Sequence, residues 1–177
     1  MDNIALIVHS LSAAVLVGGM VLLFFAVTPA TWILADEEVR RAVTRVVTRR
    51  FAVMTVIALG LLLVTGLYQF MSDTVTPAAV REDMMAFRFG PVFMAKILFT
   101  VALVILIGVH GMRSGPRIAR ATDAVIAAPD DDEARWELEN LRRTSLIFSF
   151  VMLVIGVVVL AMGVTLGNHG YAHIPID

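Results

Sequence analysis

The chain has 177 residues, of which 59% are hydrophobic and only 16% are charged. Ordinary soluble domains carry roughly 45–50% apolar and about 25% charged residues, so this composition excludes a typical soluble enzyme. The formal net charge is −1, and no basic domain outside the apolar segments is left to bind nucleic acid. Cysteine is absent, which excludes disulfides, thiolate metal sites and covalently attached haem.

Four long apolar segments predict four transmembrane helices. Three of them, residues 3–35, 51–72 and 144–176, contain no Asp, Glu, Lys or Arg, and the remaining one, residues 89–112, contains only Lys96. A bilayer span needs about 20 apolar residues. We therefore expect one all-α integral membrane domain over residues 1–177, a four-helix bundle with transmembrane helices at 4–27, 51–71, 89–112 and 145–167.

The arginines predict how these helices are oriented. The loop between the first two spans carries five arginines and the loop between the last two carries six, whereas the middle loop, residues 72–88, carries two. Basic residues near span ends concentrate on the cytoplasmic side. The sequence therefore predicts a multi-pass protein of the plasma (inner) membrane, with both termini and the middle loop on the outer side.

Both arginine-rich loops are expected to extend the spans as helices. Asp36 is placed to cap a helix that begins with Glu37 and Glu38, where acidic residues meet the positive end of the helix dipole. Residues 129–133, Pro-Asp-Asp-Asp-Glu, are typical of a second helix start. Within the spans, small residues such as the pair Gly163 and Gly167 predict close helix packing.

Two polar side chains are predicted at one depth inside the membrane. His9 lies about five residues, roughly 8 Å, inside the first span, and Lys96 about seven residues, roughly 10 Å, inside the third. His9 is expected either to bond a Ser or Thr of another helix or to be a ligand of haem or copper. Lys96 is expected either to extend toward the headgroups or to pair with a propionate, a substrate carboxylate or an outer acid such as Glu82 or Asp83.

Further candidate ligands lie at the predicted outer face. His169 and His173 are four residues apart and share one face if the last helix continues, or form a polar tail if it ends. Met84 and Met85 are ordinary apolar residues or soft thioether ligands suited to Cu(I). His110, about 21 Å along its helix from Lys96, is expected at the opposite membrane interface and outside this site.

A series of short motifs resembles the copper-resistance D (CopD-like) membrane domain. The motifs are Arg50-Phe51-Ala52, Thr65-Gly66, Phe89-Gly90, Lys96 and Gly108, preceded by His9-Ser10-Leu11 and Gly18-Gly19. This resemblance covers residues 5–115 and implies copper transport or resistance. The chain also has a looser likeness to the HemJ-type protoporphyrinogen oxidases, which implies haem b and places His9 and Lys96 in the shared core.

Three functions remain open at this point. In the first, a copper-handling protein meets the ion with His9, His169 and His173, and Met84 and Met85 serve as capture ligands. In the second, a haem b protein for electron transfer or porphyrinogen oxidation uses His9 as one axial ligand and His169 or His173 as the other, with Lys96 on a propionate. The third is an accessory subunit of a membrane complex.

The expected partners follow from these functions. They are the lipid bilayer, other membrane subunits and a periplasmic copper or electron-transfer protein. Whether the chain is an enzyme is left undecided.

Overall fold

The computed structural model describes residues 2–176, which form helices joined by short turns and contain no strand. α1 (Asp2–Leu22) continues through a π-helical segment, η1 (Leu23–Val27), into α2 (Thr28–Trp32). The other long helices are α3 (Glu37–Met71), α5 (Phe89–Ala127) and α6 (Asp132–Gly167). The short elements are α4 (Ala78–Glu82), η2 (Met84–Ala86) and α7 (His169–Ala172).

Four helical segments are long and apolar enough to cross a membrane, which confirms the predicted all-helical fold with four long apolar helices. The predicted span ends at Met71, Phe89 and Gly167 coincide with helix ends. The first segment is longer than expected and continues to Trp32, because the π-helical segment carries the helix past Val27 without a break.

The arginine-rich loops are helical, as the sequence predicts. The carboxylate of Asp36 accepts hydrogen bonds from the backbone N–H groups of Glu38 and Val39, and so caps α3. Asp131 caps α6 in the same way. These bonds satisfy donors that have no partner within the helix, so each loop contributes a long helical extension and only a short turn.

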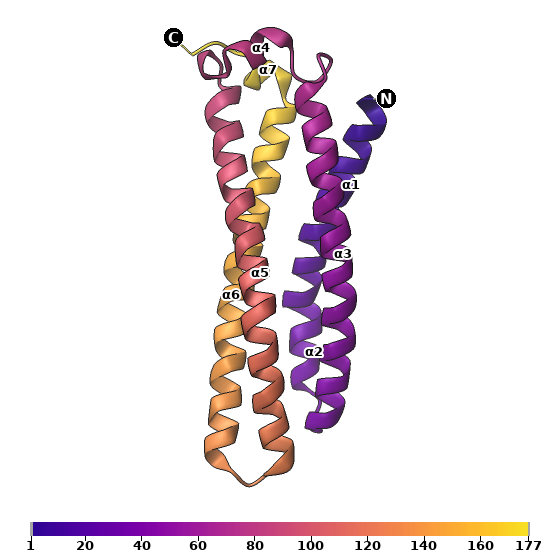
Figure 1. The fold of residues 1–177 in the computed structure, drawn as a ribbon, viewed down its shortest axis with the longest axis vertical. Helices are drawn as coiled ribbons and strands as arrows, with labels where there is room; N and C mark the ends of the chain where they lie inside the picture. The colour runs from indigo at the N-terminus through magenta and orange to yellow at the C-terminus, as the bar shows by residue number, and fades with distance from the viewer. Residues whose placement is uncertain (1, 177) are drawn as a thin grey trace.

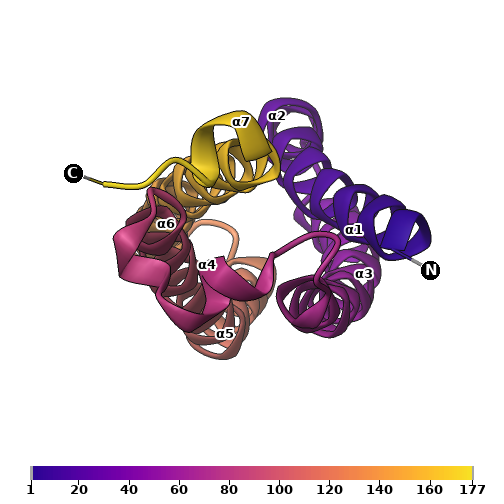
Figure 2. The ribbon, with the colours of Figure 1, turned by 90° about the horizontal axis from the view of Figure 1, so that it is seen from above.

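The bundle consists of two antiparallel helix pairs that lie side by side (Figures 1 and 2). One pair is α1, η1 and α2 against α3, and the other is α5 against α6; contacts within each pair are more extensive than contacts between them. We call the end that carries α4, η2 and α7 the cap end, and the opposite end the arginine-rich end. Both chain ends lie at the cap end (Figure 1).

A buried apolar cluster joins the two pairs near mid-height. Its members come from all four long helices: Leu16, Met20, Ala58, Leu103, Met152 and Leu153. A Cβ added at Gly156 would lie 3.5 Å from the sulfur of Met20, and one added at Gly19 would lie 2.6 Å from the Phe51 ring. The glycine at position 19 therefore lets the helices approach closely, whereas a Cβ at position 156 would be at ordinary contact distance.

The outward faces of the helices are apolar rather than polar. Leu63 is 74% exposed and Val56 is 70% exposed, and similar side chains line every long helix. Soluble monomers rarely present so much contiguous apolar surface. These faces are suited to contact with lipid chains.

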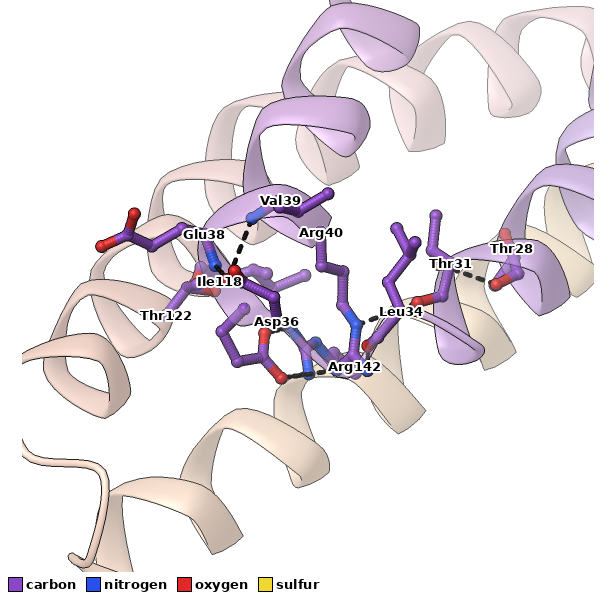
Figure 3. A network of polar contacts seen from close by, with 11 residues as sticks. Thr28, Thr31, Leu34, Asp36, Glu38, Val39, Arg40, Ile118, Thr122 and Arg142 are labelled. Atoms are coloured by element: carbon purple, nitrogen blue, oxygen red, sulfur yellow. Dashed lines mark hydrogen bonds and ion pairs between the residues drawn. The ribbon is translucent and has the colours of Figure 1, made fainter.

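Ion pairs join the two helix pairs at the arginine-rich end (Figure 3). Glu37 of α3 accepts two hydrogen bonds from Arg142 of α6, at 2.6 and 3.1 Å, and also pairs with Arg40. Arg40 in turn donates to the backbone carbonyls of Thr31 and Leu34 at the end of α2. Glu37 therefore ties the α2–α3 turn to α6.

Candidate functional site

The ring of His9 packs against α3 inside the first helix pair. Its Nδ1 lies 2.9 Å from the hydroxyl of Thr65. The Thr65 hydroxyl also donates to the backbone carbonyl of Leu61 at 2.5 Å. Because a hydroxyl has a single proton to donate, Thr65 accepts from His9, and we assign the ring proton to Nδ1 from this network.

The position of this proton determines what His9 can do chemically. With the proton on Nδ1, the lone pair of Nε2 is free, which is the state in which imidazole binds a metal. A hydrogen bond at the other ring nitrogen is the usual way in which a ligating histidine is oriented. The helix-to-helix hydrogen bond and the ligand role, two separate interpretations of His9 in the sequence, are therefore compatible.

Gly66 makes room for this ring. A Cβ at position 66 would lie 3.3 Å from Cε1 of His9, closer than most side-chain contacts. Thr65 and Gly66 thus act together, since one bonds the imidazole and the other allows it to approach α3. Sequence reasoning did not assign either residue to the site, although both belong to the Thr-Gly motif of the CopD-like resemblance.

Lys96 lies in the other helix pair, against α6. The Lys96 ammonium nitrogen lies beside Gly163, where an added Cβ would be 3.5 Å from it, an ordinary contact distance. Within residues 2–176 no carboxylate lies within ion-pair distance of Lys96. The pairing with Glu82 or Asp83, one of the alternatives predicted for Lys96, is therefore not formed in the described structure.

His9 and Lys96 lie at a similar height on the two helix pairs. Thr65, the partner of His9, is six residues from the end of α3, and Lys96 is seven residues from the start of α5, or about 9 and 10 Å along the helices. The predicted common depth of the histidine and the lysine agrees with these positions.

The cap end holds a second cluster of possible ligands. The rings of His169 and His173 stack with centroids 4.7 Å apart, although α6 ends at Gly167 and α7 is a separate turn. The Nε2 atom of His173 is buried and has no hydrogen-bond partner among the described residues. Burial, and next the neighbouring His169, hold the pKa of His173 below its ordinary value.

Met84 and Met85, the two candidate thioether ligands, also lie at the cap end. Met84 packs against the cluster formed by Val80, Phe89 and Ala172, and Ala172 directly precedes His173 in the chain. Met85 is 57% exposed, and its sulfur lies beside Gly90 at the start of α5. Two imidazoles and two thioethers are therefore available at the cap end.

The candidate ligands do not form one cluster. His9 contacts Thr65 and Gly66, whereas His169 and His173 contact each other. Over residues 2–176, no three side chains of the His, Cys, Asp and Glu types come together as a metal site. The structure thus gives two smaller regions, His9 with Lys96, and the histidines and methionines of the cap end.

His110 lies elsewhere, as expected. Its Nε2 is 3.3 Å from the hydroxyl of Ser145, and its ring stacks on Phe148 of α6. It is 14 residues from Lys96 on the same helix, about 21 Å away along the axis. His110 therefore serves as a reference position that is distant from both regions.

An open cavity of about 620 Å³ lies at the arginine-rich end and away from both regions. It is lined by the charged residues of the Glu37 ion pairs and by apolar residues at the ends of α5 and α6. None of the candidate ligands lines it, so it has no part in their chemistry.

Comparison with known proteins adds no relative: no family model, no curated protein and no solved structure matches the chain.

Proposed function

We propose that this chain is an integral membrane protein that binds haem b through His9. The observation that carries the proposal is the hydrogen bond from His9 to Thr65, which leaves Nε2 as a free, oriented ligand atom. Neutral imidazole in a membrane helix is a common axial ligand of haem iron.

The remaining residues of this region fit such a group. Lys96 is a cation without a carboxylate partner in the described structure, and it would neutralise a haem propionate in an apolar setting where an unpaired charge is costly. Gly66 lets the imidazole of His9 lie close against α3, and the Lys96 ammonium group lies beside Gly163. His169 and His173 stack on each other at the cap end, so His9 is the histidine that would hold the haem.

When bound, haem supplies one-electron redox chemistry, which suits electron transfer or porphyrinogen oxidation. The residues of the chain would do the rest: Thr65 holds the imidazole in one tautomer, Lys96 orients the propionate edge, and the helix pairs exclude water. The HemJ-type likeness, in which a helix-1 histidine and a later lysine occur together, supports the same pair of residues.

We also propose the placement in the membrane. The arginines put the arginine-rich end in the cytoplasm and the cap end outside a plasma (inner) membrane. His9 and Lys96 then lie in the outer half of the bilayer, within reach of a periplasmic electron-transfer protein. Other membrane subunits would meet the exposed apolar helix faces.

Copper handling is a second candidate, and a separate observation favours it. The cap end holds the adjacent imidazoles of His169 and His173, a buried nitrogen without a partner, and the thioethers of Met84 and Met85. Nitrogen and thioether donors suit Cu(I). The CopD-like resemblance supports this candidate, with copper as cargo and a periplasmic copper protein as partner.

An absorption spectrum and a metal analysis of the purified protein separate the two candidates. A Soret band supports the haem proposal, whereas stoichiometric copper without that band contradicts it and supports copper handling. In the haem case, His9→Ala should abolish cofactor retention and the matched variant His110→Ala should leave it intact. Equal loss in both variants, or no loss in either, would contradict the role given to His9.

In the copper case, the double variant His169→Ala with His173→Ala should lose copper, while His9→Ala should keep it. Retention of copper by the double variant would rule out the cap end as the copper site.

A further inference from the structure

Seven arginines at the arginine-rich end have no carboxylate partner within residues 2–176. All of them are exposed: Arg45, Arg49, Arg50, Arg113, Arg117, Arg120 and Arg143. The remaining arginines of that end are in ion pairs, and the only lysine of the chain is Lys96. The surplus charge at this end is therefore carried entirely by guanidinium groups.

The ion pair between Arg41 and Asp123 shows which residues of α3 and α5 lie at about the same height. The two helices are antiparallel, so residues further along α3 lie level with earlier residues of α5. Moving from this pair toward the apolar spans, Arg45 is about 6 Å higher on α3 and Arg120 is about 4.5 Å higher on α5. The first level beyond the ion pair thus carries two positive charges.

The same relation continues toward the membrane. Arg49 is about 12 Å above the ion pair on α3, between Arg117 at about 9 Å and Arg113 at about 15 Å on α5. With 3.6 residues per turn, these side chains on the two antiparallel helices turn toward the same side of the α3–α5 contact. We call Arg45, Arg49, Arg113, Arg117 and Arg120 the arginine seam.

The seam lies where the apolar spans end. Residues 51–71 of α3 contain no charged side chain, and α5 contains only Lys96 over residues 89–112. Arg49 and Arg113 are therefore at the depth of lipid phosphates when the spans are in a bilayer. An open groove of about 220 Å³ at the lower end of the seam is lined by Arg41, Arg45 and Glu38, together with Ala42 and Ile126.

Five like charges along one seam repel one another unless anions lie between them. Phosphate is the anion that guanidinium binds best, through two parallel hydrogen bonds. Clusters of four to eight basic residues next to a transmembrane helix are typical of anionic lipid binding. We propose that the arginine seam binds the phosphate groups of anionic phospholipids at the membrane surface.

This inference uses the membrane placement proposed above and is independent of haem or copper. The test compares two variants of equal charge in nanodiscs of phosphatidylglycerol or phosphatidylcholine. The seam variant is R49Q with R117Q. The control is R50Q with R143Q, because Arg50 lies at the depth of Arg49 but about 100° around α3 from it, on the side opposite to Arg41, and Arg143 is on α6.

Native mass spectrometry and thermal unfolding then give the readouts. The unaltered protein should retain phosphatidylglycerol over phosphatidylcholine, and high salt should weaken that retention. The seam variant should bind phosphatidylglycerol about 25-fold more weakly, about fivefold for each arginine removed, and the control should retain it. In phosphatidylcholine the seam variant should melt no lower than the unaltered protein, because removing two arginines relieves repulsion.

Several outcomes would overturn the proposal. One is equal retention of both lipids by the unaltered protein, and another is an equal loss of phosphatidylglycerol binding in the two variants. A third is a rise in melting temperature with inorganic phosphate equal to that with phosphatidylglycerol, which would indicate a site for free anions. The variant R49K with R117K keeps both charges, and it tests whether the glutamine variant loses lipid binding only because it is poorly folded. It should retain most of the binding, and complete loss would contradict the charge-based interaction.

Reconstitution itself reports on the membrane placement. A protein that does not enter nanodiscs contradicts the four-span proposal, whereas one that enters them and retains both lipids equally contradicts the arginine seam alone.

Discussion

Replacing Thr65 by valine tests the feature on which the haem proposal depends. Valine has nearly the shape of threonine but lacks the hydroxyl, so the Nδ1–H of His9 loses the acceptor that lies 2.9 Å away. Thr65 is buried, and the ring then loses the hydrogen bond to Thr65 that favours the proton on Nδ1. The substitution therefore changes the orientation and tautomer of His9 while leaving the packing of α1 on α3 almost unchanged.

Two free-energy effects of different size are expected. Hydrogen bonds between membrane helices contribute about 0.6 kcal/mol on average, so the helix pair should be destabilised only slightly. Loss of the partner that orients a ligating histidine typically costs 10–100-fold in affinity, or about 1.4–2.7 kcal/mol. The effect on ligand affinity should therefore exceed the effect on folding.

The assay is titration of the apoprotein with haemin in detergent, followed by absorbance. Thr65→Val should weaken binding by about 10–100-fold, and Thr65→Ser, which keeps the hydroxyl, should bind nearly as well as the unaltered protein. Nitrogen NMR of the His9 ring gives a readout that needs no haem, since the Nδ1–H form should dominate only when residue 65 carries a hydroxyl. Unchanged affinity and an unchanged tautomer in the valine variant would refute the reasoning.

Two further predictions concern the two ends of the bundle. Glu37→Gln removes the charge that holds Arg142 and Arg40 together, and should lower the free energy of unfolding by about 1–2 kcal/mol, measured by denaturant titration in detergent; an unchanged midpoint would show that the pairs contribute nothing. In metal-free protein the pKa of His173 is lowered in the folded cap. As the pH falls, the unfolded segment therefore takes up the proton before the folded cap does, so the stabilisation of the folded cap is complete above pH 6.5 and is lost below it. Hydrogen exchange of the Ile176 amide, which donates to the carbonyl of Ala86, should therefore speed up below pH 6.5 after correction for intrinsic rates, and His173→Phe should remove that dependence; an equal dependence in the variant would assign it to another group.

The sequence alone was sufficient for features that depend on local composition. Long uncharged segments have one stable form in a bilayer, and the helix ends at Met71, Phe89 and Gly167 lie where the apolar residues stop. The caps at Asp36 and Asp131 are equally local, because a carboxylate reaches the N–H groups two and three residues ahead. The common depth of His9 and Lys96 required only residue counting.

The tertiary structure decided which side chains meet. His9 and Thr65 are 56 residues apart, and whether their faces touch depends on the rotation of two helices that are apolar on nearly every side. In such helices the hydrophobic pattern does not mark an inner face. Only the packing shows that Gly66 admits the imidazole, that Lys96 lies beside Gly163, and that His169 and His173 form a separate pair at the cap end.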